Sequence, residues 1–133
     1  MNHWLLKTEP STYSWDTLVL ENTGTWDGVR NHQAKLNLQK MKKGDLAFIY
    51  HTGEEKSIVG VAVVVEGPFP EPGAEAWTSV RIQAKKKLKK PVGLTTIKAD
   101  RRLTKISLVK MSRLSVHALT KEEFDLILGL AEK

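Results

Sequence analysis

Residues 25–31 bring an indole, a carboxylate, a glycine, a guanidinium and an amide into one short segment. An aromatic face can stack on any flat ring, and nearby polar groups can then select among rings through hydrogen bonds to their edges. A segment that only joins two elements rarely needs this mixture. The composition therefore indicates one wall of a pocket for a nucleobase-like group, with Trp26 as the stacking residue.

The same residues also have structural interpretations. Trp26 could be a core tryptophan, although no periodic apolar pattern surrounds it. Asn31 is well placed to cap the following helix, whose N-terminus could equally receive acceptor atoms of a ligand. Arg30 suits a base edge or a phosphate, and it also suits an ion pair with Asp27 or Glu9. Both interpretations stay open at this point.

A second group of candidate residues lies at the end of a predicted strand over residues 46–51. Successive strand residues point to opposite faces, so Tyr50 and His51 cannot both enter one pocket from an undistorted strand. Tyr50 shares its face with Leu46 and Phe48, which favours a core position. His51 is followed by Thr52 at the start of a loop, and we expect it to be freer to contact a ligand.

The densest charge run covers residues 85–90, where lysines surround a single leucine and no acidic residue intervenes. Such a run can protect a solvated sheet edge from aggregation. It can also hold a phosphate backbone, which adds affinity without reading sequence. The lack of acidic residues slightly favours backbone contacts by Lys85, Lys86, Lys87, Lys89 and Lys90.

The length and net charge of the chain limit which classes of protein it can belong to. The 133 residues predict a single domain, and a formal net charge of +6 favours polyanionic partners. The chain has no cysteine, which excludes disulfides and thiolate metal sites and fits the reducing cytoplasm or nucleus. The first six residues show no signal peptide, and the longest apolar run, residues 61–65, is too short to cross a bilayer. We expect a cytoplasmic monomer without membrane contact.

Catalytic and metal-binding motifs are not found in the sequence. There is no G-x-S-x-G elbow or glycine-rich phosphate loop, and no metal-ligand spacing among His3, His32, His51 and His117. We therefore expect a binding module without catalytic residues, metal or cofactor. The alternative is an enzyme acting on nucleic acid or a nucleotide, with His51 and either Asp27 or Glu9 as acid–base groups. A pocket for a small metabolite is a third possibility.

Apolar periodicity, capping signals and breakers predict an irregular alternation of strands and helices. Strands are expected over residues 3–7, 46–51, 58–66, from 77 onwards, and 106–110. Helices are expected over residues 14–20, 31–41, 95–102 and 120–129, the last with a Thr120–Glu123 capping box. Residues 67–73 and 91–93 carry prolines and glycines and are expected to interrupt the strands. This pattern predicts an α+β fold around a curved or closed, mostly antiparallel sheet.

Five ordered blocks of sequence resemble the EVE domain, and together they span nearly the whole chain. They are residues 4–10, 25–34, 44–51, 57–62 and 120–124. The resemblance implies one domain over residues 1–133 with a PUA-like fold, a small and mostly antiparallel β-barrel flanked by short helices.

The resemblance also implies a pocket for a modified base, such as modified cytosine in DNA or a modified RNA base. Nucleic acid is then the expected partner, whether by DNA binding or RNA binding. By the family's pattern, the pocket would be lined or supported by Lys7, Thr8, Trp26, Gly28, Val29, Arg30, Asn31, Tyr50, His51 and Thr52. Thr52 replaces a frequent serine and keeps the hydroxyl.

Overall fold

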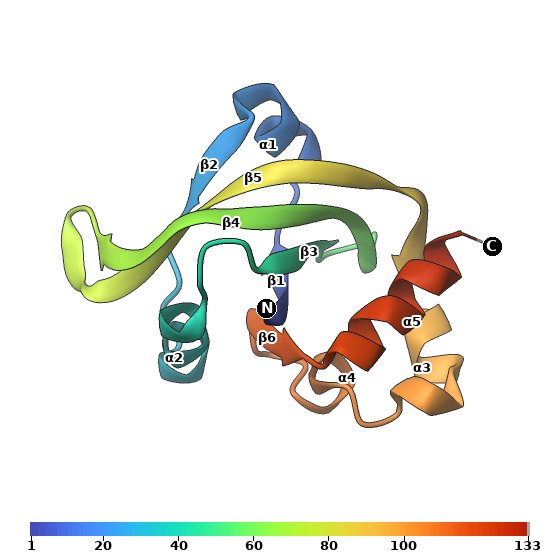
Figure 1. Ribbon diagram of the computed structural model, residues 1–133. Coiled ribbons are helices and arrows are strands. Elements are labelled where there is room, and N and C mark those ends of the chain that lie inside the picture. Colours follow the sequence, from blue (N-terminus) through green and yellow to red (C-terminus); the bar gives the residue numbers. More distant parts are fainter. Residues whose placement is uncertain (133) are drawn as a thin grey trace.

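The computed structural model describes residues 1–132, and a six-stranded mixed sheet forms its centre (Figure 1). The strand order is β2-β5-β4-β3-β1-β6, and only the β1–β3 pair is parallel. The strands are β1 (His3–Thr8), β2 (Thr23–Trp26), β3 (Leu46–His51), β4 (Ser57–Glu71), β5 (Ala74–Gly93) and β6 (Val116–Leu119). The sheet curls without closing, so its shape is barrel-like and β2 and β6 form its edges. The predicted α+β class is confirmed.

Short helices flank this sheet, and three begin at caps visible in the sequence. They are α1 (Trp15–Glu21), α2 (His32–Lys40), α3 (Leu94–Ala99), the 3₁₀ turn η1 (Arg101–Leu103), α4 (Ser107–Lys110) and α5 (Lys121–Ala131). Ser14 and Asn31 cap α1 and α2, and Thr120 with Glu123 forms the predicted capping box of α5. Gly129 lies within α5 and does not end it. None of the described helices is long and apolar enough to cross a bilayer.

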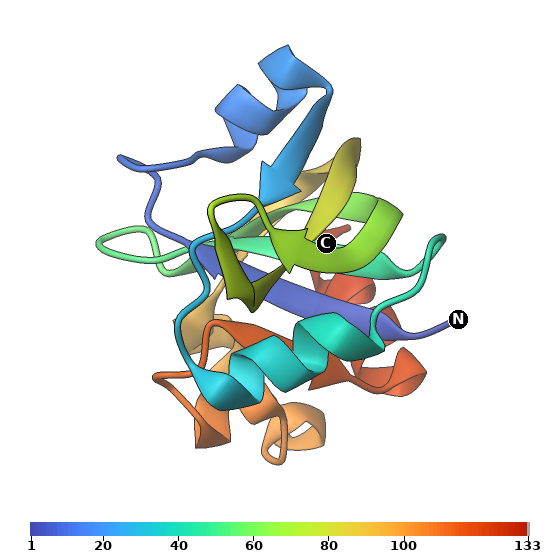
Figure 2. The same ribbon diagram turned by 90° about the vertical axis from the view of Figure 1, so that its left-hand side faces the viewer.

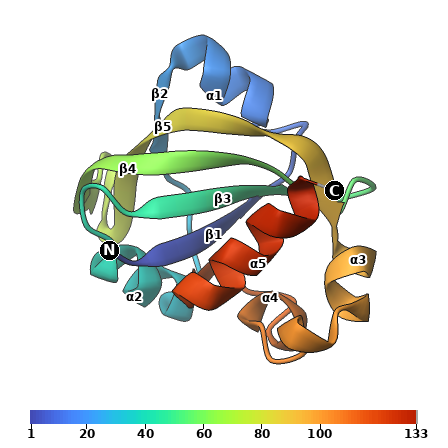
Figure 3. The same cartoon turned by 45° about the vertical axis from the view of Figure 1, so that its right-hand side comes forward.

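Two hydrophobic clusters occupy opposite sides of the sheet. Leu6 belongs to the cluster under α1 and α2, whereas its neighbour Leu5 belongs to the cluster under the C-terminal helices. This separation follows from the alternation of side chains along a strand. Figure 3 shows α3, α4 and α5 gathered at one side of the sheet, with α1 on the other side.

The prediction that residues 67–73 only connect two strands is wrong. β4 and β5 pair through this region, with Phe69 opposite Ser79 and Pro70 opposite Thr78, and form a projecting hairpin arm. Pro68 lies in a register shift between Glu66 and Phe69, where its missing N–H does not interrupt a ladder bond. The arm matters for the site because it carries Glu71 to the start of α2.

Three further expectations are corrected by long-range pairing. Residues 107–110, predicted as part of a strand, form α4, while the unpredicted strand β6 pairs with β1. β5 continues through residues 91–93, where Val92 lies opposite Ile58. Trp26 is not in a connector, because it ends β2 opposite Val80.

Candidate functional site

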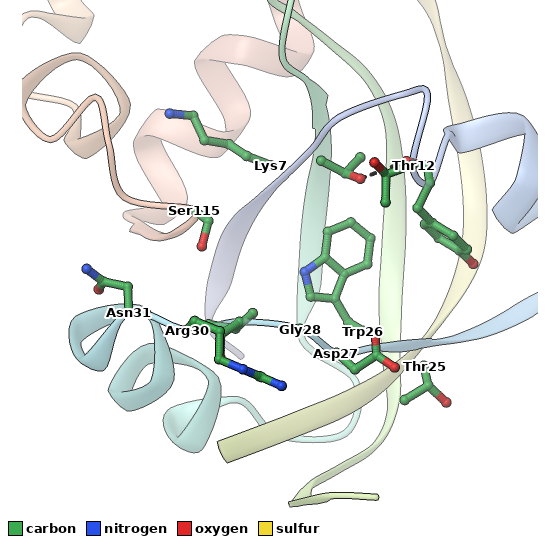
Figure 4. A pocket seen from close by; sticks show the side chains of 12 residues that line it. Lys7, Thr12, Thr25, Trp26, Asp27, Gly28, Arg30, Asn31 and Ser115 are labelled. Carbon is green, nitrogen blue, oxygen red and sulfur yellow. Dashed lines mark hydrogen bonds between the residues drawn. The ribbon is translucent and has the colours of Figure 1, made fainter. Parts of the chain in front are cut away.

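A pocket of about 510 Å³ lies where the ends of β1 and β2 meet the start of α2 (Figure 4). Small-molecule sites typically enclose about 300–1,000 Å³, so the pocket can hold a flat ring and its substituents. Figure 2 shows the segment after β2 running past the end of β1 to α2. Of the predicted residues, the structure brings Lys7, Thr8, Trp26, Gly28, Val29, Arg30 and Asn31 to this pocket.

Five lining residues lay outside the predicted site. Thr25 and Asp27 are within the segment first singled out, and Asp27 had been considered as an ion-pair partner of Arg30 or as an acid–base group. Thr12, Tyr13 and Ser115 come from a turn and from the residue before β6, and no local motif marks them. Their position depends on tertiary folding, which the sequence pattern does not encode.

Trp26 forms the floor of the pocket and also belongs to the core. Only 7% of its surface is exposed, and it packs in the cluster under α1 and α2. The ring of Tyr13 meets its indole edge-on, with ring centroids 5.9 Å apart and planes at 87°. The expectation that Trp26 lies outside any core pattern is wrong. β2 is only four residues long, so the alternation of buried residues along it is too short to be recognised in the sequence.

The corner of the pocket at residues 28–30 is held by Glu71, a buried carboxylate on the hairpin arm. Glu71 accepts hydrogen bonds from the Gly28 N–H at 2.8 Å and from both terminal nitrogens of Arg30 at 3.0 and 2.7 Å. The bonds from Arg30, then that from Gly28, hold the pKa of Glu71 below its usual value. Gly28 adopts a φ of +77°, which favours glycine. Arg30 therefore has the structural ion pair considered earlier, with Glu71 in place of Asp27 or Glu9.

Replacing Glu71 tests whether this carboxylate holds the corner. Glu71→Ala leaves the Gly28 N–H and the half-exposed Arg30 without their acceptor, and we expect a loss of about 1–3 kcal/mol of unfolding free energy. Glu71→Gln keeps one oxygen for the Gly28 N–H and should lose less. Urea denaturation of the three proteins measures the difference. Equal midpoints for all three would show that the corner does not depend on Glu71.

Lys7 and Thr8 line the pocket from the end of β1, and the polar group of each already has a protein partner, although the Lys7 ammonium keeps further donors. The Lys7 ammonium donates to the Ser112 carbonyl at 2.6 Å and lies 5.7 Å from the ring centre of Tyr50. Burial lowers the pKa of Lys7. The Thr8 hydroxyl donates to the Tyr13 carbonyl at 2.7 Å, which fixes the turn carrying Tyr13 and leaves the hydroxyl only as an acceptor for a ligand.

Asn31 combines the two interpretations given to it. Its Oδ1 accepts from the Ala34 N–H at 2.9 Å, so its role as the cap of α2 is confirmed. The residue is exposed and lines both the pocket and a neighbouring hollow. Its capping oxygen is engaged, and its amide nitrogen is the group that can face a ligand.

The predicted residues at the end of β3 do not join the pocket lining. Tyr50 lies in the core on the opposite side, as its strand face predicted. His51 is 7% exposed, accepts from the Trp15 N–H at 3.0 Å through Nε2, and lies 2.7 Å from a Glu55 carboxylate oxygen through Nδ1. The expectation that His51 is free to contact a ligand is wrong, because the following loop folds back over it.

These contacts also bear on the enzymatic alternative. Both ring nitrogens of His51 contact protein groups. Asp27 lines the pocket, whereas His51 does not. Glu9 accepts from the Thr52 hydroxyl at 3.2 Å. The proposed acid–base groups therefore do not meet in the pocket. Within residues 1–132, no group of three or more histidine, cysteine or acidic residues is placed to hold a metal ion.

The lysine run lies apart from the pocket lining. Lys85, Lys86, Lys87, Lys89 and Lys90 are all exposed on β5, beyond the residues 80–83 where β2 pairs with it. Lys86 forms an ion pair with Glu132 at 3.6 Å. Charges on an uncovered stretch of strand fit edge protection. A role in backbone binding remains a prediction.

Comparison with known proteins identifies the family. The EVE domain family matches residues 2–130 of the chain. The chain belongs to the EVE domain family. Human thymocyte nuclear protein 1 is 31% identical over 168 residues, covering 99% of this chain and 75% of the human protein.

Two solved structures are similar over nearly the whole chain. Rpa0253 from Rhodopseudomonas palustris is 43% identical with a TM-score of 0.95, covering 99% of this chain and 94% of that one. Human THYN1 protein in complex with 5-methylcytosine-containing DNA is 31% identical with a TM-score of 0.93, covering 100% and 99%. The predicted EVE resemblance and PUA-like, barrel-like fold are thus confirmed.

Proposed function

We propose that this EVE domain is a non-catalytic nucleic-acid-binding module that accommodates one modified base, such as 5-methylcytosine, in the pocket beside Trp26. The observation that carries the proposal is a base-sized pocket with an aromatic floor and a polar rim. It is supported by the human relative solved with DNA containing that base and by the chain's net charge of +6. Because one chain holds the whole pocket, we propose that the protein is a monomer. We also propose that it acts in the cytoplasm, in line with the absence of cysteine.

The groups still available in the pocket fit an amino-bearing base. Asp27 is exposed at the rim, and its carboxylate can accept from the exocyclic amine of cytosine. No other residue in the described range accepts a hydrogen bond from the Trp26 indole N–H, which leaves a donor for a ring acceptor. Val29 is buried in the lining and offers apolar surface to a methyl group. We infer that these three groups select the base.

A base reaches such a pocket most easily when it is not paired. Extruding a base from a duplex costs a few kcal/mol, and contact with an aromatic side chain returns roughly 1–3 kcal/mol per base. Single-stranded or locally unpaired nucleic acid should therefore bind more tightly than an intact duplex of the same sequence.

Anisotropy titration of single-stranded oligonucleotides with one central 5-methylcytosine, cytosine or thymine tests the proposal. Wild type should prefer 5-methylcytosine, and Asp27→Asn should weaken binding of both cytosine-type bases by roughly tenfold because it removes the charged acceptor. Glu122→Gln on α5 is the matched control, since it removes one exposed negative charge elsewhere. If wild type and Asp27→Asn bind all three oligonucleotides equally, the proposal is wrong.

A further inference from the structure

The segment that joins α4 to β6, residues 111–115, is bordered by three hollows. The base pocket touches it at Ser115. A second hollow of about 350 Å³ is lined by Asn31, Lys110 and Arg113, and a third of about 290 Å³ by Lys7, Lys56 and Ser112. The base pocket shares Asn31 with the second hollow and Lys7 with the third. The two flanking hollows therefore adjoin the base pocket, one at Asn31 and the other at Lys7.

Positive charge is available in both flanking hollows. Lys110, Arg113 and Lys56 are exposed, and Lys7 is half-buried. Within residues 1–132, none of these four forms an ion pair, and no acidic residue lines either flanking hollow. Arg30, in contrast, is neutralised by Glu71. Four cations without a carboxylate partner thus line the two hollows that adjoin the pocket.

A base in the pocket fixes where its own phosphates lie. The two phosphates that flank the base are attached to its nucleotide, so they must lie close to the mouth of the pocket. Cations at the mouth can contact them without reading sequence. The lysine run of β5 does not line the pocket or either flanking hollow, so it does not meet this requirement.

We propose that the two phosphates beside the bound base lie in the flanking hollows, one contacted by Lys110 and Arg113 and the other by Lys7 and Lys56. This inference rests on the proposed function. It assigns to the two flanking hollows the contacts with the phosphate backbone that residues 85–90 were expected to make. The side chains of Gln33 and Ser112, which line the second hollow, supply neutral donors along the same path.

The test compares the double variant Lys110→Gln/Arg113→Gln with the control Lys87→Gln/Lys89→Gln, which loses the same charge from exposed positions of the run. The first should weaken binding of modified and unmodified single strands alike, by roughly tenfold at low salt. It should reduce the slope of log affinity against log salt by about 0.7, since both side chains contact one phosphate and each phosphate that is no longer neutralised contributes about 0.7. Lys56→Gln leaves Lys7 on the other phosphate and should reduce the slope by less than about 0.7. The control should change neither quantity by more than about a third of these values.

The outcomes separate this inference from the proposed function. If the control lowers the slope as much as Lys110→Gln/Arg113→Gln, or if that variant keeps the wild-type slope, the backbone path is wrong even where the base preference stands. If the slope falls as expected but wild type shows no preference for 5-methylcytosine, the path stands and the proposed base recognition fails. Thermal midpoints equal to wild type confirm that the exposed substitutions leave the fold intact.

Discussion

Replacing Trp26 by alanine should destabilise the protein by roughly 3–5 kcal/mol, whatever it does to ligand binding. The indole is 7% exposed and packs in the cluster that contains Leu18 and Val80. Its removal leaves a cavity in that cluster and takes away the partner of the Tyr13 ring. A loss of this size is a large fraction of the stability of a domain of this length.

Urea denaturation followed by far-ultraviolet circular dichroism measures this loss without depending on tryptophan emission. Trp77→Ala is the matched control, because Trp77 lies half-exposed on the hairpin arm against Arg30 and Lys35. We expect it to cost clearly less than Trp26→Ala. A Trp26→Ala midpoint equal to that of wild type would show that the indole is not part of the core. Because the expected loss is large, Asp27→Asn is the better probe of recognition.

Acidification from about pH 6.5 to pH 4 should lower the free energy of unfolding by roughly 3 kcal/mol through His117 alone. His117 is fully buried on β6, with Nδ1 2.7 Å from the Ser107 hydroxyl and Nε2 without a hydrogen-bond partner in the described part of the chain. Burial, together with the charge of Lys7, lowers the pKa of His117 to about 4.

The sign of the effect follows from where the proton binds. In the unfolded chain this histidine titrates near its usual pKa of about 6.5, whereas the folded protein keeps it neutral down to about pH 4. Between these values the unfolded state takes up a proton that the folded state does not. The contribution of His117 is therefore fully present above pH 6.5 and is lost as the pH falls through this window.

Urea denaturation at pH 7 and pH 4.5, with wild type and His117→Gln, measures the effect. The glutamine keeps a polar side chain beside Ser107 but does not titrate, so its stability should fall less over the same interval. A nuclear magnetic resonance titration of the His117 ring adds a direct readout. A His117 signal that titrates near pH 6.5 would contradict the prediction.

Local chemistry in the sequence predicted much of what surrounds the pocket. The caps Ser14, Asn31 and Thr120 each place a side-chain oxygen before an apolar periodic run, and all three begin helices in the structure. The segment of residues 25–31 was informative because most of one pocket wall comes from consecutive residues. Signals of this kind need no knowledge of distant partners.

Features that depend on pairing between distant segments were missed. Glu71 meets Gly28 and Arg30 only because the β4–β5 arm continues past Pro68, where proline and glycine predicted a connection. The strand over residues 106–110 was predicted from local composition, but these residues form α4 and the edge strand lies at β6. His51 was expected to be accessible because Glu55 and Trp15 could not be foreseen as its partners.

The floor of the pocket is built from the same side chains that hold the fold together, and this limits how the site can be redesigned. Trp26 and Val29 are packed in the core, whereas Thr12, Thr25, Asp27 and Ser115 are exposed or half-exposed at the rim. A library that varies the four rim positions can explore new ligands at little risk to folding. A library that varies the floor would return mostly unfolded proteins, so new specificities should be sought at the rim.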